Sequence, residues 1–285
     1  MRLAVESYIP VKRLGIEAGL RAIAASGFSA VDFTFYFELE QLCAADTYLQ
    51  TARQAAAIMR ELGLVCLQAH APFSFLYDEE TTLFCPHFQN IVRAMEAASI
   101  LGAQTIVVHA PGVPQEVDRL PAALRLYRAL EPYCVKYGIR VGVENLGNTI
   151  STPEELNQLL SQLDETHFVA CLDLGHAHML GIQPQDFIRR MIPGRLQALH
   201  VHDNDGTDDQ HQLPFRGTID WNQVVVALYR YGYRGDFTME AWRFLDNFPD
   251  ALLQDALCFE ARIAAYLAAE FANTERGNLR GCIRM

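Results

Sequence analysis

A recurring junction between helical and apolar segments constrains the fold of this chain more than any other feature. Five glycines each follow a segment with helical periodicity and precede a short apolar run: Gly27, Gly63, Gly102, Gly138 and Gly232. A glycine just beyond a helix readily adopts the left-handed conformation that turns the chain into the next strand. Repetition of this junction therefore predicts a series of βα units.

Eight apolar segments of strand length follow one another, with helical segments between them. The predicted strands are Leu3–Ser7, Ala30–Phe35, Val65–His70, Thr105–His109, Arg140–Glu144, Phe168–Asp173, Leu196–His202 and Asp236–Glu240. Thr152, Pro153 and Glu155 predict a capped helix start between two of them. Eight strands in 285 residues are typical of a single (β/α)8 TIM barrel. We assign residues 1–272 to the barrel and residues 273–285 to a polar C-terminal tail.

The charge of the chain restricts its partners and its chemistry. A formal net charge of −11 argues against a sequence-independent grip on nucleic acid, which depends on clustered lysine and arginine. Lys12 and Lys136 are the only lysines, and neither lies at a predicted strand end, which argues against Schiff-base catalysis.

Cysteine usage and the N-terminal segment indicate the compartment. The seven cysteines are odd in number, form no CxxC pair, and several lie in apolar runs, which is typical of reduced, buried thiols. The first residues, MRLAVESYIP, do not resemble a signal peptide, and no apolar run reaches the length of a membrane span. We expect a cytoplasmic protein.

Residues that can bind metal or transfer a proton stand at the ends of six consecutive predicted strands. They include His70, His109, Glu144, Asp173, His200 and Glu240. In a parallel barrel the carboxyl ends of all strands meet at one mouth, so these side chains should converge. Carboxylates that directly follow apolar runs would be costly without a counter-charge, which a cation supplies. Imidazole and carboxylate ligands together suit zinc, manganese or ferrous iron better than magnesium or calcium.

The segment LHVHDNDGTDDQH, residues 199–211, concentrates potential ligands. His200 and His202 are two apart on a predicted strand and so point to the same face. The loop that follows contains Asp203, Asp205, Asp208, Asp209 and His211. Taken alone, this segment fits a metal-binding loop and an ordinary Asp- and Gly-rich surface turn equally well.

Six motifs at these strand ends resemble those of one known family. They are HAP (70–72), VHAPG (108–112), VEN (143–145), LDLGHAH (172–178), HVHDND (200–205) with DQH (209–211), and MEAW (239–242). As a set they resemble the xylose isomerase-like TIM barrels. That family includes sugar-phosphate isomerases and epimerases, inosose-type dehydratases and endonuclease IV. The resemblance extends over nearly the whole chain.

The resemblance to the isomerase and epimerase branch implies a single divalent metal ion. Its ligands would be Glu144, Asp173, His200 and Glu240. The two glutamates would also be catalytic, one removing a proton from the substrate and the other returning it through an enediolate. The family pattern His-x-x-Asp assigns the metal to His200, with His202 as the alternative ligand. We expect His202 to hydrogen-bond beside the metal site instead. His176, expected on the loop after Asp173, would bind substrate oxygens or a second ion.

The resemblance to endonuclease IV implies a larger metal site. Nine positions match its zinc ligands: His70, His109, Glu144, Asp173, His176, His200, Asp209, His211 and Glu240. This set permits a phosphodiesterase with two or three zinc ions. The acidic composition and the absence of Lys/Arg-rich loops at the predicted mouth argue against a duplex-binding enzyme. Sugar-isomerase-like members of the family with the same loop also carry these histidines.

The loop after His211 departs from the family pattern, which commonly reads Gly-Glu-Gly. Here Phe215 and Arg216 replace the first glycine and the glutamate. Arg216 either grips an anionic group of the substrate or lies on the surface, and Arg243 is a second candidate for that contact. The predicted substrate contacts are His70, His109, His176, His202, Arg216, Trp242 and Arg243. The aromatic residues that would form the wall of a polyol pocket or pack in the core are Tyr8, Phe35, Tyr36, Phe73 and Trp242.

Together these observations predict a barrel that binds one to three divalent ions (zinc, manganese, cobalt or iron). The expected activity is isomerisation or epimerisation of a ketose, a sugar phosphate or a related polyol. The alternatives are a metal-dependent keto-polyol dehydratase, an endonuclease IV-like phosphodiesterase and a noncatalytic metal- or sugar-binding barrel. Retention of both Glu144 and Glu240 argues against the last of these. A small sugar is the expected partner, no membrane is expected, and the oligomeric state is left open.

Overall fold

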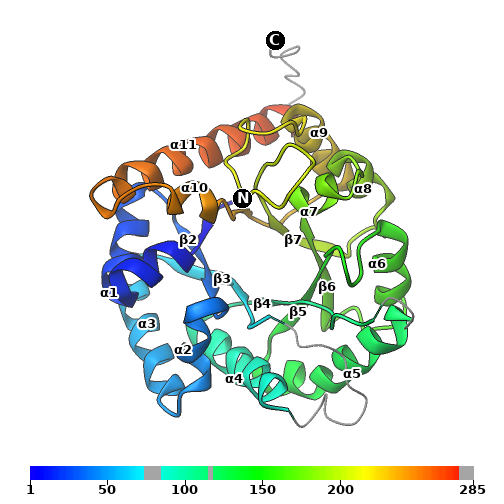
Figure 1. Ribbon diagram of the computed structural model, residues 1–285, viewed down its shortest axis with the longest axis horizontal. Helices are drawn as coiled ribbons and strands as arrows, with labels where there is room; N and C mark the ends of the chain where they lie inside the picture. The colour runs from blue at the N-terminus through cyan, green and yellow to red at the C-terminus, as the bar shows by residue number, and fades with distance from the viewer. Residues whose placement is uncertain (74–84, 115–117, 276–285) are drawn as a thin grey trace.

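Eight parallel strands form a ring in the computed structural model, which describes residues 1–73, 85–114 and 118–275 (Figure 1). The strands are β1 (Leu3–Glu6), β2 (Ala30–Thr34), β3 (Val65–His70), β4 (Thr105–Val108), β5 (Arg140–Glu144), β6 (Phe168–Asp173), β7 (Leu196–His200) and β8 (Phe237–Met239). Their order is β7-β6-β5-β4-β3-β2-β1-β8. Val201 closes the ring by pairing with Met239 just beyond β7. The predicted (β/α)8 barrel is confirmed.

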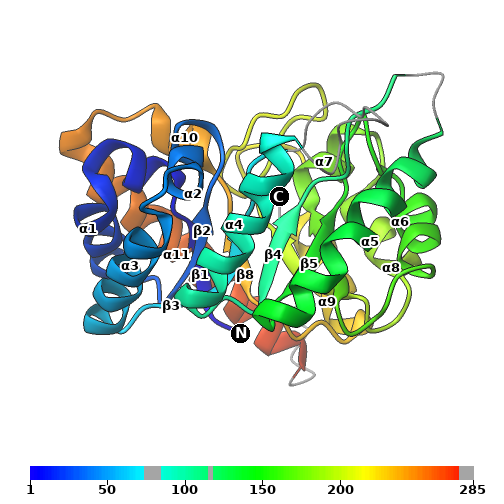
Figure 2. The same cartoon turned by 90° about the horizontal axis from the view of Figure 1, so that it is seen from below.

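Helices surround the ring of strands, as Figures 1 and 2 show. The longer ones are α1 (Tyr8–Ser26), α3 (Tyr48–Leu62), α4 (Pro86–Leu101), α5 (Arg119–Tyr137), α6 (Pro153–Leu160), α8 (Pro184–Arg190), α9 (Trp221–Tyr231) and α11 (Asp250–Glu275). Short helices add η1 (Phe37–Glu40), α2 (Gln41–Ala44), α7 (Leu174–Met179) and α10 (Trp242–Asp246). Helix α11 runs three residues into the segment expected to be a tail, and residues 276–285 lie outside the described residues.

The helix ends follow the local sequence signals. All five junction glycines cap their helices in the left-handed conformation, with φ between 63° at Gly138 and 103° at Gly27. Helix α6 begins with the predicted capping box, in which Thr152 Oγ1 accepts from the Glu155 backbone N–H at 3.2 Å. Local chemistry therefore sets where these helices stop and start.

The core has an outer and an inner part. Most buried apolar side chains lie between the strands and the helices. Inside the ring, Val107, Cys171 and Ala198 form a small separate cluster, and a side chain at Gly142 would meet Thr105, Val107 and Cys171. Because the interior residues are small, the inner apolar layer is thin and leaves polar side chains at both ends of the barrel.

Neither disulfides nor membrane helices occur in the part of the chain that the structure describes. The six cysteines in this part are free thiols. None of its helices has the length and apolarity required to span a bilayer.

Glu260 of α11 makes fold stability depend on pH. Burial raises the pKa of this carboxyl from 4.5 to about 8, and the Ala241 backbone N–H opposes the shift only in part. The folded protein therefore keeps a proton up to about pH 8 that the unfolded chain releases near pH 4.5. The contribution of Glu260 to stability is full below the lower pKa and is lost as pH rises through the higher one, by about 1.4 kcal/mol per pH unit.

We predict that Glu260→Gln flattens this part of the pH dependence. The free energy of unfolding of the variant, relative to the native protein, should rise between about pH 5 and about pH 8. Denaturant unfolding at several pH values measures it. Asp255→Asn, an exposed change on the same helix, is the control and should give a constant difference. A constant difference for Glu260→Gln as well would contradict the prediction.

Candidate metal centre

The carboxyl ends of β5 to β8 bring together four potential metal ligands. They are Glu144, Asp173, His200 and Glu240, and one ligand atom of each lies within 4.8 Å of the others. His200 Nδ1 lies 3.0 Å from Glu144 Oε1, 3.4 Å from Glu240 Oε2 and 4.0 Å from Asp173 Oδ2. All four side chains are buried. The structure thus assembles the set of ligands that the family resemblance implied.

Three buried carboxylates in this space fit a divalent cation. Glu240 Oε2 is buried and has no hydrogen-bond partner among the described residues. Burying carboxylates beside one another is costly unless a positive charge lies between them. One imidazole and three carboxylates form a donor set suited to zinc, manganese or ferrous iron.

Two histidines and Glu144 extend the site toward β3 and β4. His109 Nε2 lies 2.8 Å, and His70 Nε2 3.3 Å, from Glu144 Oε2. The ligand atoms of these three residues also lie within 4.8 Å of one another. Glu144 therefore belongs to two groups of potential ligands and could bridge two ions.

A third group of potential ligands adjoins the central four, with His202 Nε2 3.0 Å from Asp173 Oδ2. It consists of His176, His202, Asp209 and His211, again with ligand atoms within 4.8 Å of one another. Asp209 Oδ2 lies 3.0 Å from His211 Nε2 and 3.6 Å from His176 Nε2. Asp209 Oδ1 is buried and has no hydrogen-bond partner among the described residues.

Backbone carbonyls fix the tautomers of three histidines. The Nδ1 atoms of His70, His176 and His211 lie 2.8, 3.0 and 2.8 Å from the backbone oxygens of Ala71, Asn145 and Glu240. A carbonyl can only accept, so each Nδ1 carries the proton, and in the neutral ring the Nε2 lone pair faces a carboxylate. Two facing acceptors repel unless a cation or a proton lies between them. Metal-binding histidines are commonly oriented in this way.

His200 is oriented by a carboxylate instead. Its Nε2 lies 3.2 Å from Asp32 Oδ2, which leaves Nδ1 for the ligand group. Gln68 Nε2 donates to the same Asp32 oxygen at 2.6 Å and fixes that carboxylate in turn. Both partners lie inside the barrel, below the potential ligands.

The side chains around them give the two glutamates opposite pKa shifts. Burial alone would raise the pKa of Glu144, but His200 and His109 outweigh it and hold the value well below its usual range. Burial raises the pKa of Glu240 well above its usual range. Burial also lowers the pKa of His211 to about 4, so this ring is neutral at pH 7, as a metal ligand must be.

A cavity of about 420 Å³ opens above the ligands. Nine predicted site residues line it: His70, His109, Glu144, His176, Asp209, His211, Glu240, Trp242 and Arg243. Asp173, His200 and His202 are fully buried and do not line it. Tyr36 and Phe73 contribute aromatic wall, as expected, and Phe37 adds to it. Phe35 instead packs in the outer core, and Tyr8 lies behind the wall against Trp242.

The expectation that His176 lies on a loop is wrong. His176 lies in the first turn of helix α7, which follows β6 without a connecting loop. Asp173 is the N-cap residue of this helix, and its Oδ1 accepts from the His176 backbone N–H at 2.6 Å. The same carboxylate thus starts the helix and joins the ligand group.

Arg216 does not reach the cavity. Its side chain is exposed and is not among the lining residues, whereas Arg243 lies over the Trp242 ring at 5.1 Å. Asp203 fixes the turn that carries Arg216. Its Oδ2 accepts hydrogen bonds from the Phe215 backbone N–H and from Trp221 Nε1. These bonds hold Phe215 at a φ of 74°, the conformation that the glycine of the family pattern would adopt without strain.

Three residues of the site were not identified from the sequence. Asp32 and Glu6 are buried carboxylates inside the barrel, and Glu6 accepts a hydrogen bond from the Tyr36 hydroxyl. In the sequence, the one feature that points to Asp32 and Glu6 is that each is a charged residue within an otherwise apolar strand. Phe37, 46% exposed and at a φ of 50°, has no local signal, because its position depends on the turn after β2.

Sequence comparison identifies the family. A profile of the xylose isomerase-like TIM barrel matches residues 20–261, and this chain belongs to that family. An uncharacterised protein of Methanocaldococcus jannaschii is 29% identical over 201 residues, 64% of this chain and 66% of that protein. Inosose isomerase of Halalkalibacterium halodurans is 22% identical over 167 residues, 55% and 58% of the two chains. The chain thus spans no more than two thirds of the length of these relatives.

Solved structures share the fold over the full chain. A D-tagatose 3-epimerase-like protein aligns with a TM-score of 0.75 at 22% identity, covering 98% of this chain and 100% of that one. L-ribulose 3-epimerase aligns with a TM-score of 0.76 at 14% identity and 100% and 99% coverage. The IOLI protein, solved with a bound zinc atom, aligns with a TM-score of 0.73 at 16% identity and 96% and 99% coverage.

Gly175 provides a test of the site geometry. His202 Nε2 lies 3.0 Å from Asp173 Oδ2, and a Cβ atom at position 175 would lie 2.0 Å from His202 Cε1. Gly175→Ala must therefore displace the ring and remove its hydrogen bond to Asp173. We predict metal affinity at least about tenfold weaker, the scale of losing a residue that orients a ligand.

Chelator competition measures this affinity. Gly147→Ala is the matched control, because the added methyl meets nothing closer than 3.7 Å. A folded Gly175→Ala protein with native affinity would show that His202 does not support the metal site.

Proposed function

We propose that this protein is a metal-dependent isomerase or epimerase of a small ketose, sugar phosphate or polyol. One observation carries the proposal: Glu144 and Glu240, from β5 and β8, both approach the same His200 nitrogen at the floor of the cavity. Two carboxylates on either side of a bound substrate carbon can remove a proton and return one.

A divalent metal bound by Glu144, Asp173, His200 and Glu240 would polarise the substrate carbonyl and acidify the adjacent C–H. Side chains of the protein transfer the protons and position the groups involved. One glutamate accepts the proton, and the other donates one to the enediolate. Asp32 holds the His200 ring in its orientation through the contact with Nε2. The carboxylates lie in a buried floor, which excludes water from them.

The cavity supports a sugar-sized substrate. Its volume of about 420 Å³ lies in the range of small-molecule sites. Tyr36, Phe37, Phe73 and Trp242 offer aromatic faces for the C–H faces of a sugar. Arg243, beside Trp242, would bind a phosphate or other anionic substituent. The sugar epimerases among the structural neighbours and the inosose isomerase among the relatives agree with this substrate class.

A second candidate function, phosphodiester hydrolysis, follows from the number of ligand groups. Besides the central four ligands, there is a group of His70, His109 and Glu144 and a group of His176, His202, Asp209 and His211. Clusters of this kind can hold up to three zinc ions that activate hydroxide and stabilise a leaving oxygen. The bound zinc of the IOLI protein makes zinc our first choice of ion for either function.

Solvent-deuterium exchange tests the proton transfer. We predict that Glu144→Gln and Glu240→Gln each reduce deuterium incorporation into an active ketose by at least about a hundredfold, the lower range for general acid–base catalysis. Mass spectrometry of D-tagatose, D-psicose, L-ribulose and inosose incubated with the protein gives the rate. The exposed Glu165→Gln is the control. Native exchange in either active-site variant refutes the assigned role.

Metal content separates the two functions. We predict that Asp173→Asn removes the bound ion and the exchange activity. His211→Gln changes only the third group of potential ligands (His176, His202, Asp209 and His211) and should retain both. Elemental mass spectrometry counts the ions per chain. Three zinc ions, a lower count in His211→Gln and cleavage of abasic-site DNA would instead establish the second function.

A further inference from the structure

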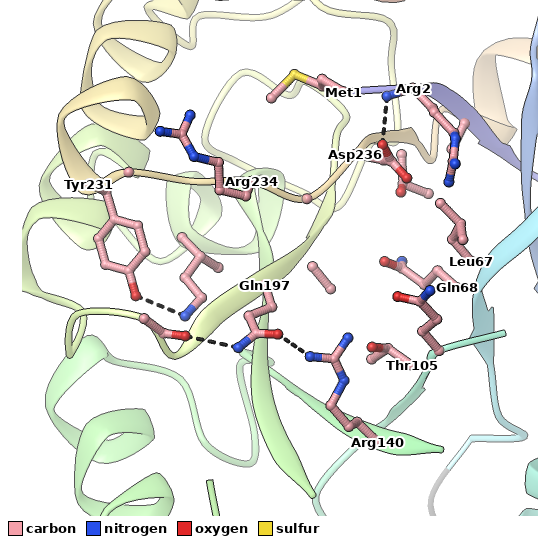
Figure 3. Close-up of a pocket in the computed structure, with 18 of the residues that line it drawn as sticks. Met1, Arg2, Leu67, Gln68, Thr105, Arg140, Gln197, Tyr231, Arg234 and Asp236 are labelled. Atoms are coloured by element: carbon pink, nitrogen blue, oxygen red, sulfur yellow. Dashed lines mark hydrogen bonds between the residues drawn. The ribbon is translucent and has the colours of Figure 1, made fainter. Parts of the chain in front are cut away.

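A second cavity lies at the opposite, N-terminal end of the barrel and takes no part in the proposed reaction (Figure 3). Its volume is about 600 Å³, within the range of small-molecule sites. The interior of a TIM barrel is normally filled by layers of bulky branched side chains. Here Ala4, Ala198 and Thr238 are among the lining residues, and their small side chains leave the barrel open from below.

The charges around this cavity are mostly positive, although the chain as a whole carries a net charge of −11. Arg2, Arg140 and Arg234 line it. Asp236 is the one carboxylate among the described lining residues, and its Oδ1 accepts from the Arg2 backbone N–H at 2.6 Å. The cavity therefore has an excess of cationic side chains.

Arg140, at the start of β5, is the key cationic group. Its Nη1 donates to the side-chain oxygen of Gln197, which is a neutral partner. No carboxylate of the described residues forms an ion pair with it, and burial lowers the pKa of its guanidinium. Arg140 is half-buried, so its guanidinium is partly desolvated without a counter-charge, and an anion in the cavity would offset that cost.

Two neutral groups add hydrogen-bonding capacity deeper in the cavity. Thr105 lines the cavity and is 5% exposed. Figure 3 shows its side chain between those of Arg140 and Gln68. Gln68 Nε2 donates to Asp32, which leaves the Gln68 side-chain oxygen for a hydroxyl donor in the cavity. An anion that also carries hydroxyl groups matches this arrangement.

We propose that the N-terminal cavity binds a small hydroxylated phosphate ester, such as a sugar phosphate. Arg140 binds the phosphate, Thr105 and Gln68 bind hydroxyl groups, and the exposed Arg2 and Arg234 add positive charge around the rim of the cavity. A phosphate suits this excess of positive charge better than a single carboxylate does, because it carries more charge and accepts bidentate hydrogen bonds from a guanidinium. This site is separate from the metal centre, and its occupation does not depend on the function proposed there.

Calorimetric titration of the protein as purified tests the proposal, with ribose 5-phosphate, inorganic phosphate and ribose as probes. We predict saturable binding of ribose 5-phosphate that is at least about tenfold weaker in Arg140→Gln, the scale of one charge-assisted hydrogen bond. Inorganic phosphate should bind more weakly, and ribose should not bind through this site. Arg53→Gln, an exposed change on helix α3 that lines neither cavity, is the matched control and should leave the binding unchanged.

Three results would overturn the proposal. They are the absence of phosphate-ester binding, native binding in a folded Arg140→Gln protein, and equally tight binding of ribose. Tighter binding of citrate than of ribose 5-phosphate through Arg140 would overturn the choice of a phosphate ester. If circular dichroism shows that Arg140→Gln does not fold, Thr105→Val and Arg2→Gln provide the test, because one is isosteric and the other changes an exposed residue. Native binding in both would then refute the site.

Discussion

The close approach of buried carboxylates at one end of the barrel is the constraint on which the rest of the site depends. Glu144, Asp173 and Glu240 converge on the His200 ring with ligand atoms within 4.8 Å. Such a group is unfavourable in a low-dielectric interior unless imidazoles, protons or a metal ion compensate its charge. Three histidines have Nδ1 held by backbone carbonyls; His70 presents its Nε2 lone pair toward Glu144, and His176 and His211 present theirs toward Asp209. The mouth is thus preorganised for cations.

The loop after β7 shows how the fold holds this mouth in place. Asp203 accepts four hydrogen bonds, from the backbone N–H groups of Asn204, Phe215 and Ile219 and from the Trp221 ring. It therefore fixes the loop that carries Asp209 and His211. Gly217 packs so closely that a Cβ there would lie 2.1 Å from the Asn204 carbonyl oxygen. In the His-x-x-Asp pattern, Asp203 therefore positions the loop, and His200 is one of the four potential ligands.

A line of hydrogen bonds joins the two ends of the barrel. His200 Nε2 lies 3.2 Å from Asp32 Oδ2, and Gln68 donates to that same oxygen while lining the N-terminal cavity. The line exists because the barrel interior is filled by small and polar residues and not by a thick apolar layer. This composition is the physical reason that both ends of one barrel can hold polar sites.

Much of the fold and of the candidate metal centre can be predicted from short segments of the sequence. The helix-ending glycines, the capping box at Thr152 and the eight apolar runs identify the barrel, because backbone conformation and period-2 burial are properties of short segments. The residues at the ends of those runs identify the potential ligands, since parallel strands must end together. Only the tertiary structure placed Asp32 behind His200, gave His176 a helix and turned Arg216 outward. It alone showed the N-terminal cavity, because a void depends on which side chains from distant strands face one another.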